Sequence, residues 1–510
     1  MITDSCTSLG VVPIFVNAGA SIAPLIIGSF TTFFAILLKP KELLALFRRK
    51  PWLPVAILAG GAGIWFLGAH LLTSPVQAAS AKKTSERAIA AQTDWNAFAL
   101  RQIREQENAS KKTGIKPIWE YSPDPDGGAM VLSSPAVAQT THRVYCTAAV
   151  QDVASFFGTV YCVDVNSGKQ VWKTDKVDGE DLKPFFSSPA LTADEKWLVV
   201  GQGLHTDADC HLICLNAETG ALRWKVKTAL HIESSPAIHG DLAVVGAGAI
   251  EGADHKPTTH PGYVFAVQIS TGKELWRHDV NDPESSPAIA DDGTVYIGSG
   301  FNGNAIVALR SESDEELKTK NLKREIWKIA APYPITGPIT LEGDLVIVGG
   351  GNSDFVYADP NPAGVVMALD RKTGAIKWQT PMDDSVLNRM VVRDGKVICP
   401  VRNGQVIALS LADGKPVWKE SVSGKTPVVA GIAVSNDGQT VFAASKDGVL
   451  ALLSAADGKL VDQKHSLNAP GKPGKGGLSL SSPTLANDKL FIGSETGGLH
   501  CFQMIQGPPK

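Results

Sequence analysis

The stretch "VNSGKQVW", residues 165–172, places a tryptophan four residues after a glycine that follows a β-rich run. A glycine beside Ser, Thr or Asp is typical of a tight turn, and β-branched and aromatic residues on either side favour strands. The chain therefore repeats one turn-and-strand unit. Its further copies are "AETGALRW" (217–224), "ISTGKELW" (269–276), "RKTGAIKW" (371–378) and "LADGKPVW" (411–418).

Each repeat spans 40 to 53 residues, which is the period of propeller blades. Four short β-rich runs fill the unit at 285–330, namely "SSPAIA", "TVYIGS", "AIVAL" and "EIWKI". Because the tryptophans keep one place on the outer strand, we expect them to dock each blade onto the next. The outer-strand position is held in turn by Trp119, Trp172, Trp224, Trp276, Trp327, Trp378, Trp418 and Asp462.

The two ends of the repeat region determine the number of blades. The last unit, "LSSPTLANDKLFIGSETGGLHCFQ", stops after three strands, and the region opens with an orphan strand, "IKPIWEYS" at 115–122. If the orphan strand completes the last blade, the ring closes and no sheet edge is left open. The sequence thus predicts an all-β, eight-bladed propeller over 115–510, with four-stranded blades closed by the N-terminal strand.

The repeat resembles the tryptophan-docking units of the PQQ-like β-propeller family, over roughly residues 115–505. That family includes quinoprotein dehydrogenases and the non-enzymatic assembly factors of the BamB type. The resemblance implies the fold, and it leaves two functions open. One is a scaffold without a cofactor; the other is a dehydrogenase that uses PQQ with calcium and passes electrons to membrane quinone.

The first eighty residues are expected to form a transmembrane hairpin. Residues 9–38 carry no charged side chain and residues 52–72 carry none besides a histidine, and each is long enough to cross a bilayer. The basic loop between them predicts a cytoplasmic turn, and so a bacterial inner-membrane protein with a periplasmic propeller. Small residues near Ala78 leave cleavage of the anchor open. A helical linker or stalk is expected over 81–114.

The composition argues against nucleic acid as a partner. The net charge is −3 and the pI is near 6.4, which gives no electrostatic basis for nucleic-acid binding.

Seven cysteines occur without a CxxC motif. Cys162, Cys214 and Cys501 fall on an inner-strand position that other units fill with small residues, so we expect them to pack like alanine. A disulfide between Cys146 and Cys162 stays open.

The motifs for quinone chemistry are not found. There is no adjacent Cys-Cys pair, and the acidic and amide residues of a calcium shell cannot be matched to positions in this chain. The sequence therefore favours a non-catalytic, membrane-anchored scaffold with no cofactor. Its expected partners are the lipid bilayer and membrane proteins of one cell-envelope complex.

One face of the propeller is expected to carry the function. The links from fourth to first strand and from second to third strand emerge together, and these are the long ones. Aromatic residues at two of them, Phe156 with Phe157 and Phe355 with Tyr357, are candidate interface anchors. The long links are 120–132, 150–158, 173–186, 203–209, 249–261, 351–363 and 463–477.

Two further features of this face are ambiguous. His255 and His260 share a loop at 251–262, and "GLHTDADCH" at 203–211 is similar; each is either a metal site or a solvated polar loop. Five blades begin with Ser-Ser-Pro, which marks where the chain turns inward. Aligning "LNRMVVRDGKV" with "SSPAIADDGTV" places Arg389 at the proline, near the channel mouth, where it either binds an anion or neutralises a carboxylate.

Overall fold

The computed structural model describes residues 114–123, 129–151, 156–205, 207–248, 261–468 and 480–505. They belong to one compact unit, Asn108–Lys510. The predicted membrane segments at 9–38 and 52–72 and nearly all of the predicted stalk lie outside the described residues.

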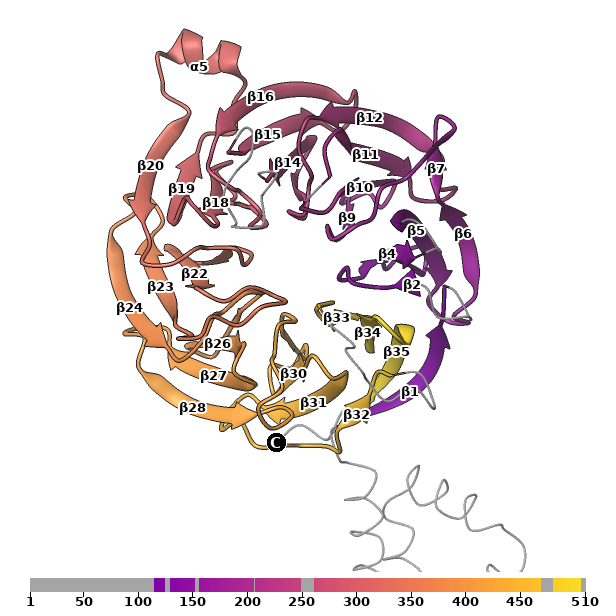
Figure 1. The fold of residues 1–510 in the computed structure, drawn as a ribbon, viewed down its shortest axis with the longest axis vertical. Helices are drawn as coiled ribbons and strands as arrows, with labels where there is room; N and C mark the ends of the chain where they lie inside the picture. Colours follow the sequence, from indigo (N-terminus) through magenta and orange to yellow (C-terminus); the bar gives the residue numbers. More distant parts are fainter. Residues whose placement is uncertain are drawn as a thin grey trace, which may run out of the picture. The chain divides into compact units, whose positions relative to one another are not determined.

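The described strands form eight small antiparallel sheets arranged as blades in a ring around one axis (Figure 1). Within a blade the chain runs from the central axis outward, so the first strand is innermost and the fourth lies on the rim. In blade 1 the first strand is split into two pieces. The bounds in blades 1 to 4 are β2 (Ala129–Met130), β3 (Ala136–Ala138), β4 (Arg143–Gln151), β5 (Phe156–Asp164), β6 (Gln170–Thr174); β9 (Ala190–Leu191), β10 (Trp197–Gly201), β11 (Cys210–Asn216), β12 (Leu222–Thr228); β13 (Ala237–His239), β14 (Leu242–Ala247), β15 (Tyr263–Gln268), β16 (Lys273–Asp279); β17 (Ala288–Ile289), β18 (Val295–Ser299), β19 (Ala305–Leu309), β20 (Glu325–Ala330).

Blades 5 to 8 repeat this order, and the last blade borrows its outer strand from the start of the region. Two elements stand apart from the blades: the hairpin β7 (Lys176–Val177) and β8 (Glu180–Asp181), and the helix α5 (Asp314–Lys320). The remaining strands are β21 (Thr340–Glu342), β22 (Leu345–Gly351), β23 (Gly364–Asp370), β24 (Ile376–Met382); β25 (Val391–Arg393), β26 (Lys396–Val401), β27 (Gln405–Ser410), β28 (Pro416–Ser421); β29 (Ala433–Val434), β30 (Thr440–Ala444), β31 (Val449–Ser454), β32 (His465–Ser466); β33 (Thr484–Ala486), β34 (Lys489–Ser494), β35 (Gly498–Ile505) and β1 (Gly114–Tyr121).

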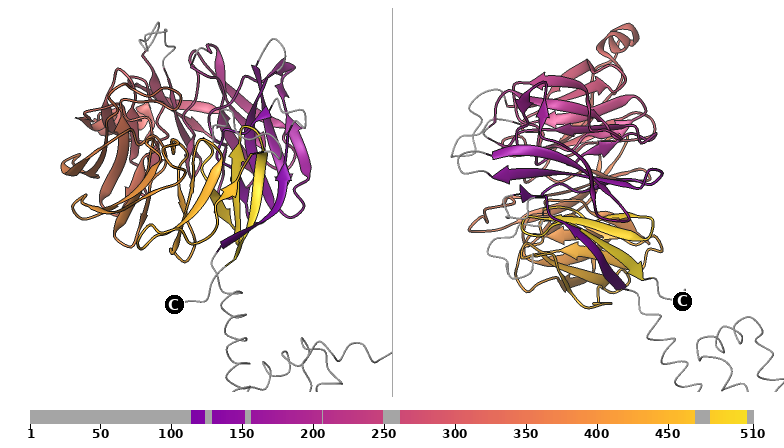
Figure 2. Two further views of the ribbon diagram at one scale, coloured as in Figure 1. Left: turned by 60° about the horizontal axis from the view of Figure 1, so that its bottom comes forward. Right: turned by 90° about the vertical axis from the view of Figure 1, so that its right-hand side faces the viewer.

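The ring closes as the sequence predicted. Strand β1 pairs antiparallel with β35 from Gly114 opposite Ile505 to Tyr121 opposite Leu499, so ends of the region far apart in the chain share one sheet. Figure 2 shows the indigo β1 beside the yellow β35. The eight-bladed, all-β fold is thereby confirmed, and blade 8 has four strands like the others.

The hydrophobic core is divided among the seams between neighbouring blades. Each of the eight seams holds its own cluster of buried side chains. In seven of the eight blades the third strand puts a small residue opposite the outer-strand tryptophan, as in Cys162 opposite Trp172 and Ala266 opposite Trp276. The small side chain lets the two neighbouring sheets approach closely.

The cysteines on the first blade are free. Cys146 on β4 faces Tyr161 on β5, while Cys162 faces Tyr145, so the two cysteines are one register step apart. Successive residues of a strand point to opposite faces, and the two thiols accordingly belong to different seams. The disulfide left open by the sequence is therefore not formed.

Tryptophans join the blades at seven seams. The indole Nε1 of Trp172 donates to the carbonyl oxygen of Ala217 in the next blade at 3.1 Å, and the indole packs on the turn glycine Gly220. A Cβ at Gly220 would lie 2.6 Å from the indole and its φ is +74°, so both space and backbone require glycine there. The other donor–acceptor pairs are Trp119 with Val165, Trp224 with Ile269, Trp276 with Ser311, Trp327 with Arg371, Trp378 with Leu411 and Trp418 with Ala455.

Candidate binding chamber in the central channel

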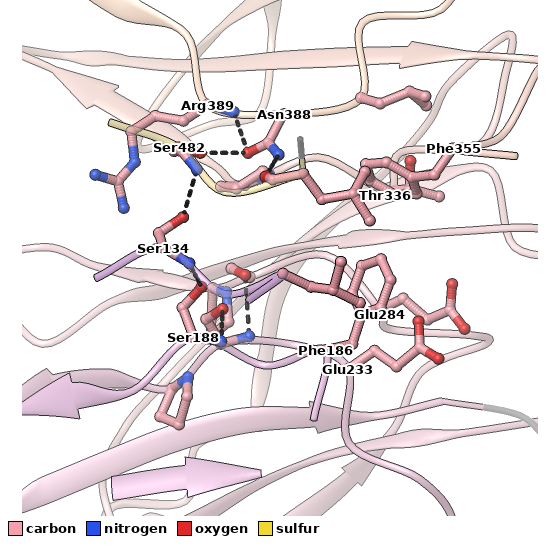
Figure 3. A pocket seen from close by; sticks show the side chains of 18 of the residues that line it. Ser134, Phe186, Ser188, Glu233, Glu284, Thr336, Phe355, Asn388, Arg389 and Ser482 are labelled. Carbon is pink, nitrogen blue, oxygen red and sulfur yellow. Dashed lines mark hydrogen bonds between the residues drawn. The ribbon is translucent and has the colours of Figure 1, made fainter. Parts of the chain in front are cut away.

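A cavity of about 430 Å³ lies at the centre of the ring; we call it the chamber. Its lining comes from the residues that begin the first strands of every blade except blade 7, and from links that emerge on the same face, including His205, Asp354 and Phe355. The chamber therefore opens on the face that carries the long links. Figure 3 shows side chains from several blades converging on it.

The first serine of each Ser-Ser-Pro motif is a structural residue. The buried Ser234 hydroxyl accepts the N–H of Gly246 in its own blade at 3.2 Å and donates to the carbonyl of Ser285 in the next blade at 2.9 Å. Ser187 does the same toward Gly201 and Ser234. A hydroxyl can donate and accept at once, so Ser187 and Ser234 each tie the second strand of one blade to the next blade, whereas Ser133 makes both bonds to Thr147 of its own blade.

The second serines face the chamber. Each hydroxyl accepts a backbone N–H from the preceding blade, so the inner rim is joined by a run of equivalent hydrogen bonds (Figure 3). The donor–acceptor pairs are Ser134 N–H to Ser188 Oγ at 2.8 Å, and at 3.0 Å Ser188 to Ser235, Ser235 to Ser286 and Ser482 to Ser134.

Arg389 occupies the second-serine position, one place from where the sequence alignment put it. Val391 pairs with Ile398 as Ala288 pairs with Tyr296, which makes Arg389 equivalent to Ser286 and not to the proline. The alignment was wrong because the blade-4 turn is one residue longer than the blade-6 turn. Its side chain therefore reaches the chamber itself.

The Arg389 guanidinium makes no ion pair with any residue that the structure describes. Its hydrogen bond runs from the backbone N–H to Asn388 Oδ1 at 2.8 Å. The side chain stays accessible to water in the chamber, while burial within the ring lowers the pKa of its guanidinium. Two roles were predicted for Arg389. No contact among the described residues supports the first, neutralisation of a neighbouring carboxylate. The second, binding of an anion, is compatible with this geometry.

The residue before the two serine positions divides the chamber into two halves. In blades 6 to 8 it is Leu387, Val429 or Leu480, and these three form a buried cluster. Phe186 from blade 2 extends this wall, and its ring centroid lies 5.7 Å from that of Phe355 in an edge-to-face contact. The blade-5 link thus crosses the channel and packs on blade 2.

In blades 3 and 4 the same position holds Glu233 and Glu284. His205 from the β10–β11 link lies between them, with Nε2 3.5 Å from Glu233 and Nδ1 3.0 Å from Glu284. His231 Nε2 is 3.2 Å from the same oxygen of Glu284. Figure 3 shows both carboxylates at one end of the chamber, away from Arg389.

The pKa values of the two carboxyl groups are shifted in opposite directions. Burial raises the pKa of Glu233, and the nearby imidazoles only partly offset this. Burial also acts to raise the pKa of Glu284, but contacts with His205 and His231 outweigh it and hold that pKa well below its usual range. One half of the chamber thus carries carboxyl and imidazole groups, and the other half has an apolar wall with Arg389 beside it.

The predicted interface residues lie at different depths on this face. Phe156 and Tyr357 are 48% and 70% exposed. Phe157 is half-buried and Phe355 lines the chamber. The blade-5 link is held by Arg402, which donates to the carbonyl of Asp354 at 2.7 Å. The loop with His255 and His260 lies outside the described residues.

Sequence reasoning missed His231, Glu233, Glu284 and Phe186. A signal was present in the residue before Ser-Ser-Pro, which is apolar in blades 1, 2 and 8 and glutamate in blades 3 and 4. Aligning all eight copies at that column, with the turn lengths corrected, would have separated the two halves of the chamber.

Comparison with known proteins identifies the lineage of this propeller. The family described as outer membrane protein assembly factor BamB matches residues 156–256, 260–361 and 302–509, which is more than half of the chain. The chain belongs to this BamB family. The family resemblance that the tryptophan repeat predicted is thus confirmed.

BamB relatives match the chain over most of their length. Outer membrane protein assembly factor BamB of Yersinia pestis is 25% identical over 354 residues, which cover 68% of this chain and 80% of that protein. The crystal structure of BamB from Moraxella catarrhalis shares the fold with a TM-score of 0.52 at 16% identity, covering 76% of this chain and 100% of that one. Subunit 1 of a methanol dehydrogenase from Methylobacterium organophilum is 24% identical over 357 residues, 61% of this chain but only 50% of its own length.

The predicted inner-membrane location is contradicted. The matched family and its BamB relatives are outer membrane assembly factors, whereas the prediction rested on the apolar segments 9–38 and 52–72, outside the described residues. Among the described residues, no helix has the length and apolar character needed to cross a bilayer. Apolar length together with the charge of the basic loop was a poor guide to the compartment.

Proposed function

We propose that this protein is a non-catalytic scaffold in outer-membrane protein assembly, and that it binds partner proteins through the face where the chamber opens. The observation that carries the proposal is the chamber, whose apolar wall and Arg389, which has no ion-pair partner among the described residues, lie on the face that also exposes Phe156 and Tyr357. Exposed aromatic and arginine side chains around an apolar centre are the usual anchors of protein interfaces. Membership of the BamB family supports the same role.

The chamber fits an extended segment of a partner better than a flat surface. A narrow cavity ringed by second-serine hydroxyls offers hydrogen bonds to a peptide backbone, and the wall of Leu387, Leu480 and Phe186 accepts apolar side chains. Arg389 would bind an acidic group of that segment. Envelope proteins that assemble in the outer membrane are the proposed partners.

A quinoprotein dehydrogenase is the second candidate, favoured by the methanol dehydrogenase match. The chamber residues do not fit its cofactor. PQQ is a tricarboxylate held with calcium, yet the described residues contribute one arginine to the chamber lining, and the oxygens of Glu233 and Glu284 lie against imidazoles. Asn388 Oδ1 already accepts from Arg389 N–H and Ser482 Oγ. No catalytic step is therefore derived through PQQ.

Site-specific photo-cross-linking tests the scaffold. A cross-linker at Tyr357 should trap outer-membrane assembly proteins in cells, while one at Asp394, in the turn between β25 and β26 on the opposite face, should not. Arg389→Glu should lower the yield at Tyr357 at least severalfold without changing the amount of folded protein. Equal trapping at the two faces, or an unchanged yield in Arg389→Glu, would contradict the proposed face. PQQ-dependent dye reduction with an alcohol or sugar would overturn the scaffold function itself.

A further inference from the structure

The cluster of His205, His231, Glu233 and Glu284 is built from three neighbouring blades. One nitrogen of each histidine and one oxygen of Glu233 lie within 4.8 Å of one another. Ligands of one ion bound at roughly 2.0–2.2 Å sit about 3–4 Å apart, so small side-chain rotations bring these three atoms to one centre. Blades 2 and 3 supply these three ligands, and blade 4 supplies Glu284 beside them.

The cluster is buried and incompletely paired. His231 is 0% exposed and the Glu233 side chain is 6% exposed. Glu233 Oε1 and His231 Nδ1 have no hydrogen-bond partner among the residues that the structure describes. Burying a carboxylate oxygen without a partner is costly, and a bound cation at this position would remove the cost. This orphan oxygen distinguishes the cluster from an ordinary buried ion pair.

The donor types indicate the class of cation. Calcium and magnesium are bound by oxygen ligands, whereas two imidazoles with one carboxylate are typical of zinc and similar transition-metal ions. Glu284 lies within hydrogen-bond reach of both histidine rings, as do the outer carboxylates that orient metal-bound histidines. The geometry points to a zinc-type site in which His205, His231 and Glu233 are the ligands and Glu284 positions the rings.

Three protein ligands leave a fourth position on a tetrahedral ion. His205, Glu233 and Glu284 all line the chamber, so this position faces the chamber interior. A donor group of whatever enters the chamber could occupy it. The site itself requires no partner, and its existence is therefore separable from the scaffold function.

Metal titration of the purified full-length protein, freed of metal by a chelator, tests the site. Zn²⁺ should bind saturably with one equivalent per chain by calorimetry, Co²⁺ should give the visible absorption of a low-symmetry site, and excess Ca²⁺ should not compete. His205→Gln and Glu233→Gln should each weaken Zn²⁺ binding about tenfold or more, and Glu284→Gln about tenfold as a loss of outer-carboxylate support. His278→Gln is the matched control, because His278 lies 3.8 Å from Glu325 in a pair outside the chamber.

The His205 variant keeps the test decisive if a buried substitution impairs folding, since the His205 side chain is 53% exposed. Far-ultraviolet circular dichroism and the unfolding midpoint would verify that each variant is folded. Absence of saturable Zn²⁺ and Co²⁺ binding would overturn the proposal, as would binding that persists unchanged in His205→Gln and Glu233→Gln. Loss of metal binding in the control variant would do so as well.

Discussion

The seams between the blades and the chamber at their centre are made from the same repeat, but they use it differently. At seven seams an indole donates to the next blade, and at six of these it also packs on a turn glycine. At the seam of Trp276 the Arg324 guanidinium lies over the indole. Around the chamber, the position before the two serines carries leucine, phenylalanine or glutamate, and the second-serine position carries arginine in blade 6. Positions fixed by packing therefore determine the fold, and positions free of that constraint are available for binding.

The eighth seam shows what happens when the constant element is replaced. Asp462 stands in place of the tryptophan, and its carboxylate accepts the N–H of Ile115 on the closing strand at 3.2 Å. His465 lies 3.5 Å from the same oxygen. Where the ring closes, polar contacts thus substitute for an indole, and titratable groups enter the structure of the seam.

Removing an indole should have the largest effect on stability. Trp276 is 2% exposed, and its Nε1 donates to Ser311 O at 2.9 Å. Trp276→Ala should lower the free energy of unfolding by about 3–5 kcal/mol, since it leaves a cavity and an unpaired carbonyl. Urea denaturation would measure the shift, with the exposed Val417→Ala as control. A loss below about 1 kcal/mol in Trp276→Ala would mean that the seams are not held by their tryptophans.

The second-largest effect is expected from acid, which should lower the stability of the blade that closes the ring. Burial lowers the pKa of His500 on β35 to about 4, so the folded state keeps this imidazole neutral while the unfolded chain protonates it near pH 6.5. Stability is then lost as pH falls from 6.5 to 4, by about 3 kcal/mol in all. Glu120 Oε2, 3.9 Å from His500 Nδ1, is the charged group facing it.

Urea denaturation at several pH values would measure this loss, and His500→Gln should flatten the curve between pH 6.5 and 4. If that variant keeps the full acid sensitivity of the unaltered protein, the sensitivity arises elsewhere.

The sequence predicted the features that recur in every blade because packing requires them. It missed the contacts that form only when the closed ring brings distant blades together. The tryptophan spacing and the orphan strand sufficed for eight closed blades, because each obeys a local rule. The contact of Phe186 with Phe355 joins loops from blades 2 and 5, and no periodic pattern marks such a pair. Arg389 was misplaced by one position because a turn of different length shifts a strand without changing its hydrophobic pattern.

The smallest effects on the free energy of unfolding are expected from alanine substitutions of the two serines of one motif. Comparing the two variants tests where the scaffold ends and the chamber begins. Ser234 is buried and bridges Gly246 N–H and Ser285 O, so Ser234→Ala leaves both groups unpaired and should cost about 1–3 kcal/mol. Ser235 is half-buried and faces the chamber, where water can replace its bond to Ser188 N–H, so Ser235→Ala should cost about 0.5 kcal/mol or less. Urea midpoints of the two variants measure this directly. If Ser235→Ala proved the more costly, the inner rim would have to be assigned to the scaffold, and the chamber would begin only at Glu233 and its equivalents.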